Sequence, residues 1–423
     1  MKLRCLVIIC CCCLVAQRTL AQAVKARTDD FIYDFDIRTP QVYLAPAGAI
    51  QNMLLPPITA LGSGLPLILE FDKLSEQMER FAVRIINCNA DWSVSQLNPT
   101  EYLDSYNEFF ITDRQLSFNT KVNYVHYRFE VPPVKVSGNY LIKVYEEGYE
   151  TNVKLTRRFM VFENGASIAS QFGSPTGVEE AQRNQQIQFS VNYGAFQLVN
   201  PMQQIKVVLR QNFRWDNAIV GLQPTFVRDF ERTLDYQHFN LENNFKGGSE
   251  FRLFDCRNFQ ARNLNVAKQE MRPKINEIFI NPDESRNGWA YNKPFEDKNG
   301  RYFVQNVLGR DGGTEADYME VVFTLKLPAE VPGAVYITGG FADWQLIDEY
   351  RMKYFADQQC YQTVLVLKQG AYDYQYSYLR PDGKRDDVFF EGTHARTGNS
   401  YEILVYLRPV GGRSDRLIGY KLF

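Results

Sequence analysis

Apolar and polar residues alternate with a period of two along most of the chain, which is typical of β-strands that bury only one face. QQIQFSVNY (185–193) places Ile187, Phe189, Val191 and Tyr193 on one side. The same alternation recurs in VNYVHYRFEV (122–131), VVFTLKL (321–327) and YDYQYSY (372–378). We therefore predict strands at these segments, each with a buried and a solvent-facing side.

Turn-forming sequences separate these segments, among them GSG, VSGN, KGG, DKNG, PDG and RTGN. Gly, Asn and Pro favour the backbone conformations of tight turns, so these sequences mark the ends of strands. Long stretches with a helical period are missing from the sequence. The pattern predicts an all-β fold of sandwiches in series.

The breaks in this pattern suggest four parts of the chain. Residues 1–23 are set apart as an export signal, and strand patterns then run through 24–165 as a first domain. The polar stretch GSPTGVEEAQRNQQ is interpreted as a linker into a second domain over 166–317. A last domain is expected over 318–423.

The first 23 residues have the composition of a secretory signal peptide. A positive start, MKLR, precedes an apolar stretch of about a dozen residues and a small-residue end, TLAQA. Such a stretch is too short to span a bilayer, and no later segment is long and apolar enough. We therefore expect an exported protein without a membrane span.

Charge and cysteine content narrow the functional classes. The formal net charge is −2, and loss of Lys2, Arg4 and Arg18 with the signal makes it more negative still, which gives no sign of a nucleic-acid partner. Five of the eight cysteines lie in the signal, leaving Cys88, Cys256 and Cys360. An odd, widely spaced set predicts three buried thiols in preference to one disulfide, and its spacing does not suggest zinc.

No motif in the chain predicts catalysis, a cofactor or a metal site. The sequence lacks GxSxG, HExxH, GxGxxG and P-loop patterns. His126 lies within a strand pattern, and His238 and His394 lie in polar loops, so all three are interpreted as structural. A pair of carboxylates placed for glycoside hydrolysis stays open, because the sequence does not give their separation. We nevertheless expect a protein that is not an enzyme.

Three tryptophans stand beside Asn or Asp: Trp92, Trp215 and Trp289. An aromatic ring in such a position at a strand end often packs on the edge of a sandwich while its N–H finds a polar partner. We expect this structural role for all three.

Several linked segments resemble the plug protein family of the Bacteroidota type IX secretion system. They are INCNADWSVSQLNPTEYLDSYNEFFITDRQLSFNTKVNYVHYRFEVP, SGNYLIKVYEEG, VVLRQNFRWDNAI and GGSEFRLFD, and the resemblance runs from about residue 30 to 310. It implies an all-β periplasmic protein that closes the periplasmic opening of the outer-membrane translocon barrel while no cargo passes. The resemblance implies no catalytic residues.

The last part of the chain is similar to the glycogen-binding, early-set immunoglobulin-like module. The similarity rests on VYITGGFADW, QGAYDYQYSYLRPDG and TGNSYEILVYL, and it implies consecutive immunoglobulin-like β-sandwich domains. It also implies a sugar-stacking role for Trp344 and a polar contact from Asn399. Two features of the module are missing, because Gln375 replaces a lysine and no second tryptophan follows the PDG turn. We therefore expect the fold of the module to be kept and its sugar site to be largely lost, with Trp344 a structural corner in preference to a residual glycan contact.

These observations leave two functional hypotheses besides the hydrolase. The first is a non-catalytic periplasmic component that plugs the translocon barrel of the type IX secretion system, with that barrel as its partner. The alternative is a carbohydrate-binding protein of the periplasm or cell surface that uses the C-terminal module. Exposed edge strands, or the loops around Trp289, are the surfaces expected to contact the translocon.

Overall fold

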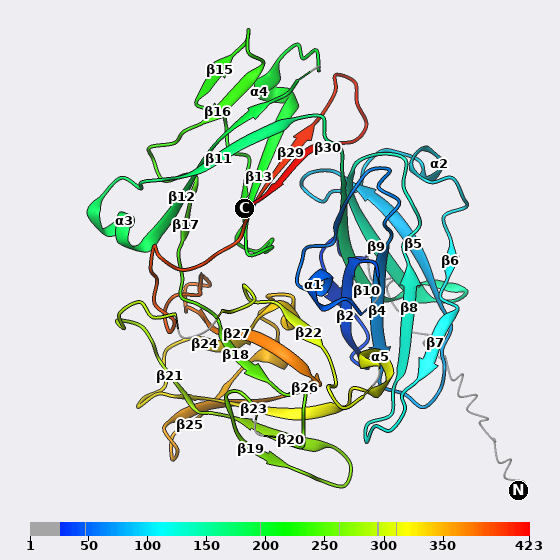
Figure 1. Cartoon of the computed structure of the whole chain (residues 1–423), viewed down its shortest axis with the longest axis vertical. Coiled ribbons are helices and arrows are strands. Elements are labelled where there is room, and N and C mark those ends of the chain that lie inside the picture. The colour runs from blue at the N-terminus through cyan, green and yellow to red at the C-terminus, as the bar shows by residue number, and fades with distance from the viewer. Residues whose placement is uncertain (1–25, 47, 195, 262, 294–295, 310) are drawn as a thin grey trace, which may run out of the picture.

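The computed structural model describes residues 26–423 except 47, 195, 262, 294–295 and 310. Its described part is 44% strand and 7% helix, which confirms the predicted all-β fold. The strands form six sheets, which pack in pairs as three sandwiches around a common centre (Figure 1). The predicted export signal lies outside the described residues.

The first sandwich packs a six-stranded sheet on a four-stranded sheet, and short helices lie in its loops. The larger sheet contains β1 (Phe31–Ile32), β3 (Ile58–Ala60), β5 (Phe81–Cys88), β6 (Phe109–Phe110), β9 (Gly138–Glu146) and β10 (Tyr149–Phe162). The smaller contains β2 (Ile37–Leu44), β4 (Leu67–Lys73), β7 (Asp113–Leu116) and β8 (Val125–Glu130). The helices are α1 (Ile50–Met53) and α2 (Pro99–Tyr102). Sheet pairing is antiparallel except between β3 and β10.

The second sandwich combines strands from two distant parts of the chain. One sheet contains β11 (Ser167–Gly173), β12 (Asn184–Asn192), β15 (Phe226–Arg228), β16 (Thr233–Tyr236) and β17 (Asn244–Lys246). The other contains β13 (Ile205–Gln211), β14 (Ile219–Val220), β29 (Tyr401–Leu407) and β30 (Arg416–Leu422). Its helices are α3 (Val178–Arg183) and α4 (Pro201–Gln204).

The third sandwich is formed by the chain between β17 and β29. One sheet contains β18 (Arg252–Asp255), β22 (Tyr302–Val304), β24 (Ala334–Thr338), β27 (Gly370–Leu379) and β28 (Arg385–Asp386). The other contains β19 (Val266–Glu270), β20 (Asn276–Ile280), β21 (Asp283–Glu284), β23 (Tyr318–Lys326), β25 (Lys353–Phe355) and β26 (Cys360–Lys368). Helical turns are α5 (Gly312–Glu315), η1 (Gly340–Ala342) and η2 (Asp348–Tyr350).

The third sandwich is thus inserted into the second, which corrects the predicted boundary at 317/318. β29 pairs along its whole length with β13, from Ile205 opposite Leu407 to Gln211 opposite Tyr401. β18 and β22 pair instead with β27 of the third sandwich. The sequence prediction assumed that each domain is continuous, because an alternating pattern identifies a strand without identifying its partner.

The predicted linker is also corrected. GSPTGVEEAQRNQQ begins at Gly173, the last residue of β11, and it contains α3 and the start of β12. β11 and β12 pair with each other, so this stretch connects two strands of one sheet. The chain passes from the first sandwich to the second between Phe162 and Ser167, close to the predicted boundary at 165.

The predicted strands have the expected buried faces, but one of them has no solvent-facing side. Ile187, Phe189 and Val191 of β12 are buried in the core of the second sandwich. In β27 the four tyrosines face the core of the third sandwich, yet Asp373, Gln375 and Ser377 on the opposite side are buried too. That side is covered by neighbouring segments: the loop before β22 hydrogen-bonds Asp373, and Asp387 hydrogen-bonds Ser377.

Candidate functional site

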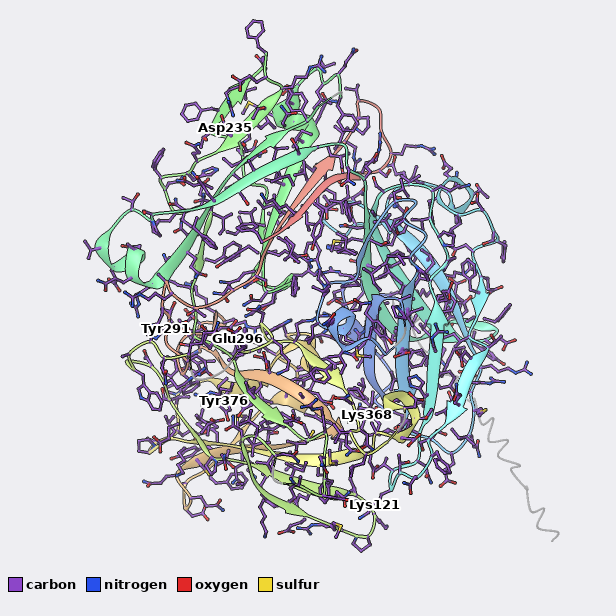
Figure 2. All side chains as sticks on the ribbon, viewed as in Figure 1. Lys121, Asp235, Tyr291, Glu296, Lys368 and Tyr376 are labelled. Atoms are coloured by element: carbon purple, nitrogen blue, oxygen red, sulfur yellow. The ribbon has the colours of Figure 1, made fainter. Side chains whose placement is uncertain are left out.

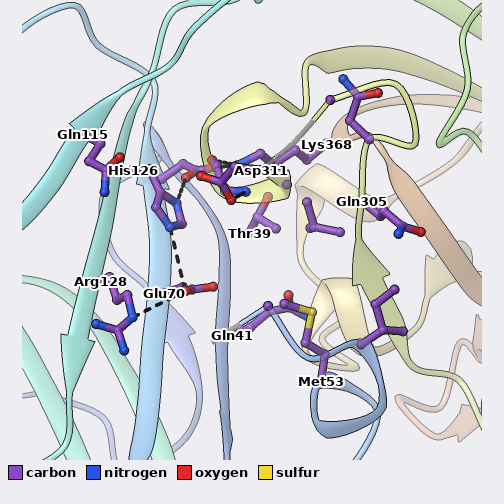
Figure 3. A pocket seen from close by; sticks show the side chains of 18 of the residues that line it. Thr39, Gln41, Met53, Glu70, Gln115, His126, Arg128, Gln305, Asp311 and Lys368 are labelled. Atoms are coloured by element: carbon purple, nitrogen blue, oxygen red, sulfur yellow. Dashed lines mark hydrogen bonds and ion pairs between the residues drawn. The ribbon is translucent and has the colours of Figure 1, made fainter. Parts of the chain in front are cut away.

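A cavity of about 430 Å³ lies between the first and third sandwiches (Figure 3). β2, β4, β7 and β8 of the first sandwich line one side. The segment that follows β22, the start of α5 and the end of β26 line the other. Figure 2 shows Lys368 at this boundary, where β26 approaches the first sandwich.

Three polar side chains of the cavity wall, Asp72, His126 and Lys368, together with Tyr318, which hydrogen-bonds Asp72, form a group that we call the Asp72 cluster. The Lys368 ammonium and the Tyr318 hydroxyl each donate to Asp72 Oδ2 at 2.6 Å, and His126 Nδ1 lies 2.7 Å from Oδ1. Burial alone would raise the pKa of Asp72, but Lys368 and His126 outweigh it and lower that pKa. The carboxylate is therefore held charged between two sandwiches.

Lys368 has two further contacts, both near α5. Its ammonium donates to the Gly313 carbonyl at 2.6 Å and lies 4.2 Å from the centre of the Tyr124 ring. The Tyr124 hydroxyl in turn donates to the Ala316 carbonyl at 2.8 Å. Because Asp72 and Lys368 are engaged on several sides, neither is free to act as a nucleophile or general base. The arrangement is suited to joining two sandwiches.

His126 is the one histidine that takes part in this junction. It projects from β8 on the face opposite Val125 and Tyr127, as predicted, and its Nε2 lies 4.0 Å from Glu70. Glu70 accepts from the Tyr43 hydroxyl at 2.6 Å. The prediction of a structural role for His126 is confirmed. Its partners Asp72 and Lys368 were missed, because they lie in segments far apart in the sequence.

The second sandwich presents exposed apolar side chains along two edge strands, β14 and β15. We call this region the 219–230 edge. Val220, Phe226 and Phe230 are largely exposed to solvent. β15 ends its sheet, and Asp235 on the adjacent β16 lies towards the free end of the molecule (Figure 2). Clustered apolar side chains beside an unpaired strand edge are typical of a protein-binding surface.

The structure places Trp344 in a covered position. Its side chain follows η1, and the residue is 8% exposed. The Arg214 guanidinium lies 4.2 Å from the ring centre, and Phe251 packs edge-on at 5.6 Å. A side chain at Gly300, whose φ is +77°, would overlap the ring. The stacking face that the glycogen-binding resemblance implies is therefore occupied by protein.

Asn399 is engaged with the second sandwich. Its amide donates at 2.8 Å to Gln185 Oε1 and to the Gly247 carbonyl, and it accepts from Asn212 at 2.7 Å. TGNSYEILVYL lies mostly in β29, which belongs to the second sandwich, whereas GGFADW lies in the third. The predicted module over 318–423 is thus not one continuous unit.

The remaining predictions concern tryptophans and cysteines. Trp92 and Trp215 pack edge-to-face at 5.0 Å across the boundary between the first and second sandwiches, which confirms a packing role. The expected polar partner is missing for Trp92, whose buried Nε1 has no hydrogen-bond partner in the described structure. Trp289 is 55% exposed, so the predicted packing on a sandwich edge is wrong for this residue. Cys88, Cys256 and Cys360 are free and buried, as predicted.

No group of three or more His, Cys, Asp or Glu side chains among the described residues could hold a metal ion. No helix in that part of the chain is long and apolar enough to cross a membrane.

Comparison with known proteins gives the family. Residues 37–163 match the model of the type 9 secretion system plug protein 1st domain, and this range covers most of the first sandwich. The chain also matches the crystal structure of a hypothetical protein from Parabacteroides merdae ATCC 43184, with 31% identity and a TM-score of 0.88. The match covers 94% of this chain and 100% of that one. The chain belongs to the family of that protein. No curated protein matches it.

The match of residues 37–163 supports the plug family that the sequence resemblance implied. The family model covers the first sandwich, whereas the resemblance was read over about residues 30–310. The Parabacteroides merdae structure extends the shared fold over all three sandwiches. The match of residues 37–163 supports a role associated with the type IX secretion system.

Proposed function

We propose that this chain is a non-catalytic periplasmic component of the type IX secretion system that plugs the periplasmic opening of the outer-membrane translocon barrel. The observation that carries the proposal is the match of residues 37–163 to the plug protein first domain. The partner is then the translocon barrel, and the protein acts by physically blocking the opening of the barrel.

The way the sandwiches are joined supports this proposal. A plug has to keep its shape while it blocks a pore, and interfaces between domains hold a fixed geometry when they are large and apolar. Between the first and second sandwiches, an apolar cluster buries Leu141 and Met160 against Leu404 and Leu417. Between the first and third, the Asp72 cluster and the apolar pair Ile68 and Phe303 are buried.

The 219–230 edge is the surface that we assign to the translocon. A contact that has to be released when cargo passes should be of modest size and partly polar. The edge offers Phe226 and Phe230 beside Arg228, whose guanidinium is paired with Asp235 at 2.8 Å. The segment around Trp289 in the third sandwich, also exposed, is the competing surface.

The test is retention of the tagged chain by outer-membrane fractions of a strain that expresses the translocon. We expect the wild-type chain to co-purify with the barrel and the double variant Phe226→Ser, Phe230→Ser to be released. Trp289→Ser is the matched control, because it also removes an exposed aromatic ring and should be retained. Recovery of the wild-type chain only as a free monomer would contradict the plug function.

If only Trp289→Ser is released, the plug function is still supported, and the translocon contact is assigned to the segment around Trp289 in the third sandwich. Circular dichroism of the three purified chains should be identical, since none of these side chains is buried.

A further inference from the structure

Four arginines gather where the three sandwiches meet. Arg157 and Arg158 lie on β10 of the first sandwich, Arg210 on β13 of the second, and Arg301 just before β22 of the third. All four line a recess of about 90 Å³ that we call the arginine recess. A wider cavity of about 490 Å³ adjoins the recess and shares Arg158, Arg301 and several other lining residues with it.

Two of these arginines have carboxylate partners but retain unused donors. Arg157 pairs with Asp343 at 3.0 Å, and Arg210 pairs with Glu402 at 2.7 Å. Their side chains are only 4% and 2% exposed, and the buried Nε atom of each has no hydrogen-bond partner in the described structure. A buried donor without a partner costs free energy on the order of 1–3 kcal/mol.

The other two arginines have no ion pair with a carboxylate in the part of the chain that the structure describes. Arg158 Nε donates to the Thr28 carbonyl at 2.7 Å, and its guanidinium stacks on Trp92 and Trp215. Arg301 donates to the carbonyls of Met53 and Leu55 at 3.2 and 3.1 Å. Main-chain carbonyls accept hydrogen bonds without neutralising either charge.

Two carboxylates, Asp30 and Asp343, line the recess beside its four arginines, so its lining carries more positive than negative charge. Asp343 is already paired with Arg157, and Asp30 accepts from the backbone N–H of Arg158 at 2.7 Å. Burial lowers the pKa of Arg158 and of Arg301, and the Arg210 charge lowers both further, whereas Asp30 acts on both in the opposite direction. Arg210 is thus close enough to repel both Arg158 and Arg301 in a partly dehydrated space.

We propose that the arginine recess binds a small oxyanion of the phosphate class, held by Arg158, Arg210 and Arg301. Each of these residues comes from a different sandwich, so one bound anion would tie all three together. Guanidinium groups match the geometry of phosphate oxygens and form charge-assisted hydrogen bonds with them. The recess has room for about three water molecules, which suits a compact anion. This site is independent of the proposed plug function.

The test is calorimetric titration of the full chain with sodium phosphate, at constant ionic strength in chloride buffer. We expect saturable binding of one phosphate per chain. Arg158→Gln and Arg301→Gln should each weaken it by about tenfold or more, because each removes a charge-assisted contact. Two variants on different sandwiches are used so that a folding defect in one leaves the other informative.

Arg80→Gln is the matched control, since its side chain is 71% exposed and far from the recess in sequence and sheet position. It should bind phosphate like the wild type. Glycerol 3-phosphate in a parallel titration distinguishes a free anion from a phosphate ester: similar affinity for both indicates the free anion, and tighter binding of the ester places its glycerol in the wider cavity. No saturable heat with either probe in the wild type, or equal weakening in Arg80→Gln, would overturn the proposal.

Discussion

The first sandwich meets its two neighbours through interfaces of different chemistry. Towards the second sandwich it buries Leu141 and Met160 against apolar residues of β13, β29 and β30, with Trp92 and Trp215 at the margin. Towards the third it buries an ion pair, Asp72 with Lys368, in which each side chain is 2% exposed, beside a cavity of about 430 Å³.

This difference assigns different tasks to the two interfaces. The hydrophobic effect is non-directional and does not depend on a titrating group, so the first interface mainly supplies association free energy. A buried ion pair adds little net free energy over an apolar pair of the same shape, but it penalises any arrangement that separates the charges. The second interface therefore fixes how the third sandwich is oriented.

Breaking the ion pair between Asp72 and Lys368 should have the largest effect on the free energy of unfolding. We expect Lys368→Met to lower the free energy of unfolding by about 3–5 kcal/mol, because the Asp72 charge is then buried without its ammonium partner. Urea denaturation measured by fluorescence checks this value.

The control is the double variant Asp72→Asn, Lys368→Met. This variant removes both charges, so no uncompensated charge remains. Its free energy of unfolding should fall by less than half as much as that of Lys368→Met. Equal losses in the two variants would show that packing, and not the pairing of charges, holds this interface.

The apolar interface should give a smaller effect than the broken ion pair. Leu404 is fully buried on β29 and faces the first sandwich. We expect Leu404→Ala to lower the free energy of unfolding by about 3 kcal/mol, through lost burial and the space left behind. The loss should be the same at pH 5.5 and at pH 8, because no titrating group is removed. A loss that varies with pH would show instead that this apolar cluster is coupled to the ion pairs that cross the same boundary, such as Glu163 with Arg416.

The sequence predicted the fold class better than it predicted these interfaces. The period-two pattern located β12 and β23, because a strand that buries one face has alternating apolar and polar residues in its own sequence. The sequence of a strand does not show which other strand it pairs with, and the insertion of the third sandwich between β17 and β29 was therefore missed. Asp72 and Lys368 are 296 residues apart, so nothing local indicates that they meet. Asp373 was placed on a solvent-facing side for the same reason, since the segments that cover it are distant in the chain.

The third sandwich contains a pair of acids, Asp297 and Asp373, whose titration should change stability with pH in the opposite direction to that of Asp72. Burial and the neighbouring Asp373 raise the pKa of Asp297 to about 7, and burial raises that of Asp373 to about 6. Acids with a raised folded pKa bind more protons in the folded state, so stability should fall by a few kcal/mol as the pH rises from about 4, the unfolded pKa, to about 7, the folded pKa of Asp297. The pKa of Asp72 is lowered, so its contribution is lost only as the pH falls below about 4.

Urea denaturation measured from pH 3 to pH 8 checks both predicted directions in which stability changes with pH. Asp297→Asn should flatten the profile between about pH 4 and 7 whatever its effect on absolute stability. Asp104→Asn, whose side chain is 81% exposed, should leave the profile unchanged. A wild-type profile that rises steadily towards pH 8 would contradict the predicted direction.

The smallest effect is expected on adding a sugar, which we predict does not bind at Trp344, at the interface between the second and third sandwiches. Arg214 of the second sandwich covers the face of Trp344 in the third, and the Arg214 guanidinium is itself fixed by Asp216 and Asp387 at 2.6 and 2.5 Å. A glycan would have to displace this arginine before it could stack on the ring, and one stacking contact offers only about 1–3 kcal/mol in return. We therefore expect titration with maltoheptaose to produce no heat in the wild type, and Trp344→Ala to change stability without changing that result. Saturable binding that Trp344→Ala abolishes would instead show that this interface opens, and it would restore the carbohydrate-binding hypothesis.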